Sequence, residues 1–114
     1  MLTIYHNPRC SKSRQTLALI EEKGLVHEVV LYLDTPLSAK ALSIIIGKLG
    51  VTPRDIIRKG EDAYKSQGLA DNNLSDATLI QAMVEHPKLI ERPIVIKGKK
   101  AIIGRPPENV LGLL

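Results

Sequence analysis

The first third of the chain has the hydrophobic pattern of a strand, a helix and a second strand. Residues 2–5 form a short β-prone run that ends at the Asn7-Pro8 turn signal. Apolar residues then recur at helical spacing from about Ser11 to Lys23, and Gly24 provides a stop. Residues 28–32 are rich in β-branched side chains and predict a strand. Over this length the two strands should be parallel, with a right-handed crossover.

The middle of the chain is predicted to be mainly helical. Residues 34–36 open a helical region, in which apolar residues recur every three or four positions until Gly50. A short helix is expected over residues 53–59. Another runs from Ser75, a suitable N-cap, to the break at His86-Pro87. Residues 60–74, between these two helices, are polar and partly loop-like.

The last part of the chain predicts a β-hairpin and a closing helix. Residues 93–97 and 101–103 flank Gly98-Lys99-Lys100, which is a hairpin pattern. Prolines at positions 106 and 107 suit the first turn of a helix that runs through Leu114. Elements in this order bury their apolar faces in a mixed sheet covered by helices, so an α/β class is expected. No repeat or linker divides residues 1–114, which predicts a single domain.

The composition favours a globular protein and argues against a disordered chain, a nucleic-acid-binding protein and a membrane protein. With 114 residues, of which 44% are hydrophobic and 25% charged, the chain is expected to form one globular core rather than a disordered segment. The core must be aliphatic because the sequence has no Phe and no Trp. The net charge of +4 comes from scattered basic residues, which favours a solvated surface over a nucleic-acid interface. No signal peptide or membrane span is recognisable, so we expect a cytoplasmic protein without membrane contact.

The single cysteine, Cys10, excludes an internal disulfide and a multi-cysteine zinc site. The three histidines are far apart in the sequence, so no metal site is expected. Cys10 lies where the first strand joins the first helix, and the N–H groups and dipole at a helix N-terminus favour a thiolate. Arg9, Lys12 and Arg14 add positive charge nearby. The local sequence therefore favours a reactive nucleophile, which could have an oxyanion bound beside it, over a buried structural cysteine.

Two neighbouring positions restrict the chemistry of this thiol. Residue 13 is serine, so the Cys-x-x-Cys redox pair is absent and a resolving thiol must come from another molecule. A phosphatase-type loop would need arginine six residues after the cysteine, but position 16 is threonine. Ser13 therefore favours a thiol that begins a redox cycle and depends on an external thiol to complete it, and Thr16 weakens a tyrosine-phosphatase-like function.

Several separated motifs resemble one family. The segment Ile4-Tyr5-His6-Asn7-Pro8-Arg9-Cys10-Ser11-Lys12-Ser13-Arg14 resembles the active-site opening of the glutaredoxin-coupled arsenate reductases. The similarity continues, in order, through Tyr32-Leu33-Asp34-Thr35-Pro36, Arg58-Lys59, His86-Pro87-Lys88-Leu89-Ile90-Glu91-Arg92-Pro93-Ile94-Val95 and Gly104-Arg105-Pro106-Pro107-Glu108. The chain is most similar to the short chromosomal bacterial members, and it ends before the C-terminal extension of the longer plasmid-borne enzymes.

The resemblance implies a thioredoxin-like fold with a helical insertion between the βαβ unit and the C-terminal hairpin. It implies that Cys10 attacks arsenate and that His6 and Ser13 support the thiolate. It further implies that the oxyanion and its adduct are bound by Arg58, Arg92 and Arg105. Pro93 matches the proline, cis in thioredoxin-like proteins, that faces the cysteine.

Without the family, these assignments stay open. A guanidinium suits a tetrahedral oxyanion because it donates two parallel charge-assisted hydrogen bonds. Each arginine alone could equally be a surface cation, although Arg92 and Arg105 lie at strand ends next to prolines and Arg58 does not. His6 could be protonated beside the thiolate, could orient the turn, or could have no chemical role. Pro93 could be an ordinary trans proline.

The sequence leads to three functional hypotheses. In the first, the protein reduces arsenate to arsenite with glutathione as external reductant and glutaredoxin as partner, and with no bound cofactor. In the second, it is a non-enzymatic regulatory or binding module, like the related redox-sensing transcription regulators that contact RNA polymerase. Ser13 stands against this, because those regulators use a Cys-x-x-Cys switch. In the third, it is a thiol oxidoreductase acting on another oxyanion or on a glutathione mixed disulfide.

Overall fold

The computed structural model describes residues 2–114, which form two compact units. The first unit comprises the chain up to Thr35 and again from Arg92 to Leu114, and the second comprises Pro36–Glu91. The second unit is therefore an insertion between the two halves of the first. This division matches the expected helical insertion between the βαβ segment and the hairpin.

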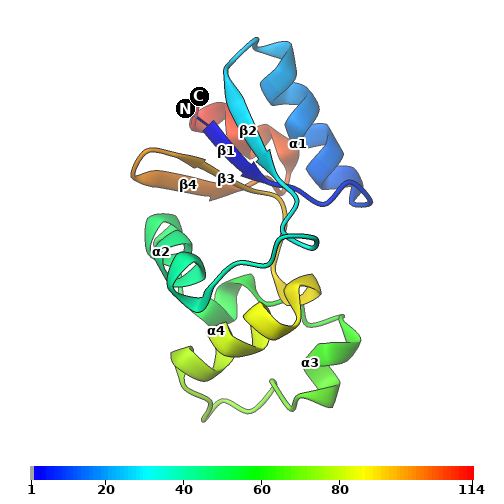
Figure 1. Ribbon diagram of the computed structural model, residues 1–114, viewed down its shortest axis with the longest axis vertical. Helices are drawn as coiled ribbons and strands as arrows, with labels where there is room; N and C mark the ends of the chain where they lie inside the picture. Colours follow the sequence, from blue (N-terminus) through cyan, green and yellow to red (C-terminus); the bar gives the residue numbers. More distant parts are fainter. Residues whose placement is uncertain (1) are drawn as a thin grey trace. The chain divides into compact units, whose positions relative to one another are not determined.

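The first unit is built on a four-stranded mixed sheet (Figure 1). Its strands are β1 (Leu2–Tyr5), β2 (His27–Val30), β3 (Ile94–Lys97) and β4 (Lys100–Ile103), in the order β2-β1-β3-β4. β1 and β2 are parallel, whereas β3 is antiparallel to both β1 and β4. The predicted parallel pair and the predicted hairpin are both confirmed.

Two helical elements cover one face of this sheet: α1 (Ser11–Glu22) and the 3₁₀ helix η3 (Pro107–Gly112). Their buried side chains meet those of β1 and β3 in one aliphatic cluster: Leu2, Ile4, Ile20, Val95, Val110 and Leu113. The expected aliphatic core is therefore present, and it fixes α1 against the strand that precedes it. Because β1 leads through a short loop into α1, this packing also fixes where the loop and Cys10 lie.

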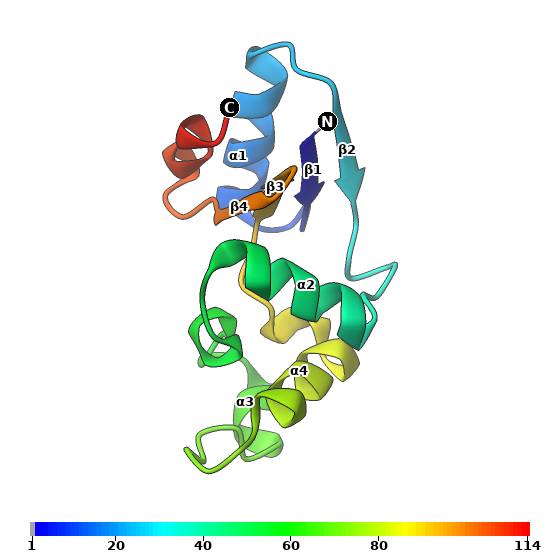
Figure 2. The same ribbon diagram turned by 90° about the vertical axis from the view of Figure 1, so that its left-hand side faces the viewer.

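The second unit is helical, with α2 beside α4 (Figure 2). Its elements are α2 (Ala39–Leu49), η1 (Pro53–Ile56), α3 (Asp62–Ser66), α4 (Asp76–Glu85) and η2 (Pro87–Leu89). Ser38 and Ser75 cap α2 and α4, because each hydroxyl accepts a hydrogen bond from a backbone N–H three residues later. Gly50 ends α2 in the left-handed conformation with φ 70°.

Some predicted boundaries were wrong for local reasons. The second strand ends at Val30, because the Leu31 carbonyl accepts the N–H groups of Asp34 and Thr35 in a turn. That turn also delays the helix expected from residue 34, which begins at Ala39. Residues 60–74, predicted to be loop-like in parts, contain the short helix α3 (Asp62–Ser66).

The short helices also differ in type or extent from the prediction. The closing helix and the helix predicted over residues 53–59 are both 3₁₀, and the second ends at Ile56. The hairpin turn is one residue shorter than predicted, with Gly98 at φ 61°. Within the part of the chain that the structure describes, no helix is long and apolar enough to cross a bilayer.

The core of the first unit leads to a stability prediction. Ile4 is fully buried at the centre of the sheet, so Ile4→Ala removes buried methyl groups and leaves a cavity. We expect the free energy of unfolding, measured by urea denaturation, to fall by about 3 kcal/mol. The control is Val26→Ala, because the Val26 side chain is 74% exposed. An equal loss of stability in both variants would contradict the assigned core.

Candidate active site

The loop between β1 and α1 is held by its own hydrogen bonds. The Cys10 N–H donates to the Asn7 carbonyl oxygen at 3.0 Å, and the Arg9 N–H donates to Asn7 Oδ1 at 3.0 Å. The guanidinium of Arg14 donates to the Pro8 carbonyl oxygen at 2.9 Å. These bonds close a tight turn in front of the helix and place Cys10 at its N-cap position.

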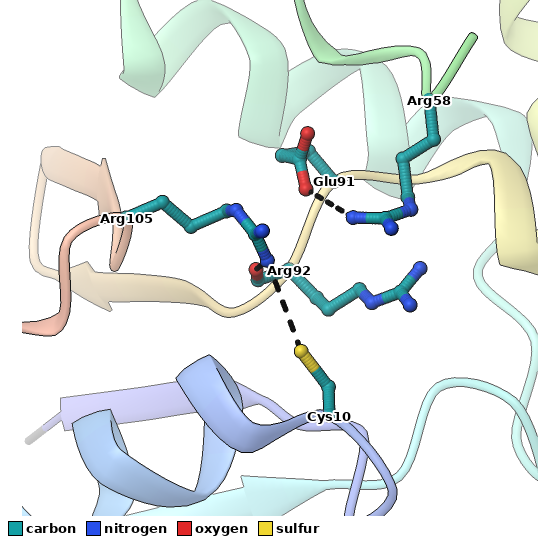
Figure 3. A network of polar contacts seen from close by, with 5 residues as sticks. All are labelled: Cys10, Arg58, Glu91, Arg92 and Arg105. Carbon is teal, nitrogen blue, oxygen red and sulfur yellow. Dashed lines mark hydrogen bonds and ion pairs between the residues drawn. The ribbon is translucent and has the colours of Figure 1, made fainter. Parts of the chain in front are cut away.

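The Cys10 thiol is partly exposed, and Figure 3 shows that the Arg105 guanidinium contacts its sulfur. Nη1 of Arg105 lies 3.8 Å from Sγ and also donates to the carbonyl oxygen of Arg92 at 3.3 Å. Arg92 acts on the thiol as well, because its side chain, as a donor and as a charge, lowers the pKa of Cys10. Arg92 immediately precedes β3, and Arg105 follows β4 by two residues, so the paired strands bring both cations to the start of α1.

The pKa of the Cys10 thiol lies below its ordinary value of 9.0. Partial burial acts in the opposite direction and raises this pKa, but four other effects outweigh it. They are the backbone N–H of Ser13, the hydrogen bond from Arg92, the charge of Arg92 and the backbone N–H of Lys12. The helix N-terminus thus acts as the sequence predicted, whereas the effective side-chain cation is Arg92 rather than Arg9, Lys12 or Arg14.

His6 supports the loop through Ser13. His6 Nδ1 and Ser13 Oγ are 2.6 Å apart, and the same hydroxyl oxygen accepts the Asn7 N–H at 3.0 Å. Burial and the charge of Arg14 lower the pKa of His6, although Glu21 opposes them. His6 is therefore neutral at neutral pH, and this favours the orienting role over a protonated partner of the thiolate.

The peptide bonds Arg92–Pro93 and Arg105–Pro106 are both cis. The Gly104 N–H donates to the Pro93 carbonyl oxygen at 2.9 Å, which ties the end of β4 to the segment before β3. The first unit therefore gathers six of the seven residues that the sequence singled out: His6, Cys10, Ser13, Arg92, Pro93 and Arg105.

Arg58, the seventh, belongs to the second unit and is paired there. Its Nη1 lies 2.7 Å from Glu91 Oε1 (Figure 3), and each side chain is about one quarter exposed. A short antiparallel pairing holds the two segments together, because the Arg58 N–H donates to Leu89 and the Glu91 N–H donates to Ile56. Among the described residues, the buried Nε of Arg58 has no hydrogen-bond partner.

Comparisons with known proteins place this site in a family. A model described as the ArsC family matches residues 5–113. The chain belongs to the ArsC family. An arsenate reductase of Haemophilus influenzae is 53% identical over 112 residues, which cover 97% of each chain. An Escherichia coli K12 protein, named as the uncharacterised protein YfgD, is 56% identical over 97% of this chain and 94% of its own.

A solved structure of an arsenate reductase from Vibrio cholerae superposes with a TM-score of 0.96. It shares 50% sequence identity, and the alignment covers 99% of this chain and 97% of that one. The thioredoxin-like ArsC fold expected from the motifs is thereby confirmed.

Two of these local arrangements were not predicted from the sequence. Asn7 is buried and organises the loop with both its backbone and its side chain, although its sequence signal indicated only a turn before Pro8. Glu91 pairs with Arg58, and the only signal for it is a carboxylate directly before Arg92. Among residues 2–114, no group of three or more His, Cys, Asp or Glu side chains is arranged to hold a metal ion.

Thiol reactivity tests the electrostatics of the site. Arg92→Gln removes a charge and a hydrogen bond from the thiolate, so the pKa of Cys10 should rise. Alkylation at neutral pH should then slow by about threefold or more. The matched control is Arg9→Gln, because Arg9 is next to Cys10 in sequence but does not lower its pKa. Equal alkylation profiles over pH for the two variants would contradict the role of Arg92.

The lowered pKa of His6 predicts a pH dependence of stability. Between the folded pKa and the ordinary value of 6.5, the unfolded chain binds more protons than the folded chain. Stability should therefore fall as the pH decreases through 6.5 towards the folded pKa. Urea denaturation above and below this pH should show a steeper loss in the wild type than in His6→Asn. Parallel losses would show that His6 is not the responsible group.

Proposed function

We propose that this ArsC-family protein reduces arsenate to arsenite, with Cys10 as the nucleophile. The observation that carries the proposal is a thiol at the N-terminus of α1 with Nη1 of Arg105 3.8 Å from its sulfur, in a chain 53% identical to a named arsenate reductase. Arg92 and backbone N–H groups lower the pKa of this thiol. A thiolate is the reactive form of cysteine, and guanidinium groups beside it favour a tetrahedral anion at the sulfur. One small site therefore combines a nucleophile with binding groups for its substrate.

The chemistry begins with attack of the Cys10 thiolate on arsenic. A sulfur–arsenic bond forms, and one arsenate oxygen takes up protons and leaves as water. Arg92 and Arg105 bind the remaining oxygens and stabilise the negative charge on the adduct. The Arg105 guanidinium already lies at the sulfur, so little reorganisation of this side chain is needed when the adduct forms.

Arg58 is the third arginine of the proposed oxyanion set. Its buried Nε lacks a partner among the described residues, and such an unpaired donor costs about 1–3 kcal/mol. Its Nη1 is already occupied by Glu91 of the same unit.

The proposed reductant is glutathione, with glutaredoxin as the second thiol and no bound cofactor. Glutathione adds to arsenic through its sulfur, and a second water leaves. The glutaredoxin thiolate then attacks the glutathione sulfur and forms a mixed disulfide. The electron pair of the broken As–S bond stays on arsenic, which becomes As(III). Water hydrolyses the last S–As bond, which releases arsenite and restores Cys10, in a cycle suited to the thiol-rich cytoplasm.

A coupled assay with arsenate, glutathione and glutaredoxin tests the proposal. The wild type should turn over, Cys10→Ser should not, and omission of glutaredoxin should stop the reaction. Arg105→Gln should lower kcat/KM by about 10- to 100-fold, because one charge-assisted hydrogen bond to the adduct is lost. Arg9→Gln is the matched control and should retain wild-type rates.

The same assay separates the alternatives. Equal rates for the wild type and Cys10→Ser would end the proposal. A higher kcat/KM for a glutathionylated peptide than for arsenate would instead support a thiol oxidoreductase acting on mixed disulfides. Copurification with RNA polymerase, without arsenate turnover, would support the regulatory module.

A further inference from the structure

Gly104 is enclosed by two buried side chains. A Cβ atom at this position would lie 2.5 Å from Thr16 Oγ1, 3.0 Å from Thr16 Cγ2 and 2.8 Å from Pro93 Cγ. Contacts shorter than 3.0 Å essentially do not occur for real Cβ atoms, so any side chain at residue 104 requires a neighbour to move. Gly112, in the same unit, has nothing within 4 Å of its corresponding position.

The neighbours of Gly104 have little freedom to move. Thr16 is fully buried and β-branched, and its hydroxyl donates to the Lys12 carbonyl oxygen at 2.8 Å. The same hydroxyl lies 3.4 Å from the Gly104 carbonyl oxygen. Pro93 is a rigid ring, and its carbonyl oxygen accepts the Gly104 N–H at 2.9 Å. An added methyl group would therefore displace backbone rather than a flexible side-chain end.

Each residue of this contact is joined to a group at the sulfur. Thr16 lies on α1, the helix that begins after Cys10. Pro93 directly follows Arg92, and Gly104 directly precedes Arg105. A shift at the Gly104 contact therefore changes the distances among the thiol and the two guanidinium groups.

We propose that Gly104 is a positioning residue, whose lack of a side chain lets the end of β4 pack directly on α1 and Pro93 and so sets Arg105 and Arg92 at the Cys10 sulfur. The inference rests on the proposed function only in taking this sulfur as the reacting atom. Its geometry involves no substrate. The consequence can therefore be measured on the thiol itself.

The first test compares Gly104→Ala with Gly112→Ala. The readout is the pH dependence of Cys10 alkylation by iodoacetamide, with circular dichroism to establish that each variant is folded. Gly104→Ala should move the profile to higher pH and slow alkylation at neutral pH by about threefold or more. Gly112→Ala should leave the profile unchanged. A folded Gly104→Ala variant with the wild-type profile would overturn the proposal.

The second test asks whether the Thr16 contact transmits the effect. Thr16→Ala removes Oγ1 and Cγ2, so it should reduce the shift caused by Gly104→Ala to half or less, with the Pro93 contact accounting for the remainder. An equal shift in both backgrounds would overturn the proposed contact. If Gly104→Ala does not fold, Thr16→Val replaces the hydroxyl by a larger methyl group at the same place. It should shift the profile in the same direction, and an unchanged profile would count against the proposal.

These readouts are independent of arsenate turnover. A shifted profile in Gly104→Ala, with no arsenate reduction by the wild type, would refute the proposed function and leave the positioning role intact. Normal arsenate turnover by the wild type, with an unshifted alkylation profile in Gly104→Ala, would refute the positioning role and leave the proposed function intact.

Discussion

The negative charge on the Cys10 sulfur is the constraint on which the rest of the site depends. Partial burial of the thiol disfavours that charge, so the pKa of Cys10 lies below its ordinary value of 9.0 only because fixed donors compensate. The backbone N–H groups of Lys12 and Ser13 provide part of the compensation, and Arg92 provides a hydrogen bond and a full charge. All of these donors are already in place in the fold, so the thiolate is stabilised before any substrate arrives.

The topology explains how these donors meet. The loop after β1 presents Cys10, and the antiparallel pairing of β3 with β4 brings Arg92 and Arg105 beside it, although 13 residues separate them in the sequence. The net charge is also unevenly distributed between the two units. The first unit contains nine Lys and Arg against five Asp and Glu, whereas the second contains seven of each, so the whole net charge of +4 lies in the unit that holds the thiol. Such a field attracts small anions and disfavours protonation of the thiolate.

Much of this could be predicted from the sequence, because local signals set the elements. Ser75, Gly50 and the Asn7-Pro8 turn mark boundaries through backbone chemistry that the structure reproduces. Only one of the two kinds of group that stabilise the thiolate could be predicted from its position in the sequence. Helix N–H groups follow from chain position, but sequence proximity pointed to Arg9 and Arg14, and the tertiary fold uses Arg92 instead. The packing of Gly104 against Thr16 was beyond prediction for the same reason, since 88 residues separate them.

The central claim is that Cys10 is a thiolate prepared for attack on an oxyanion. Ultraviolet titration of the thiolate, taken as the difference between the wild type and Cys10→Ser, measures this directly with and without arsenate. We expect a midpoint below the ordinary thiol value of 9.0, and loss of thiolate absorbance when arsenate forms its covalent adduct. A midpoint at or above 9.0, with no response to arsenate, would contradict it.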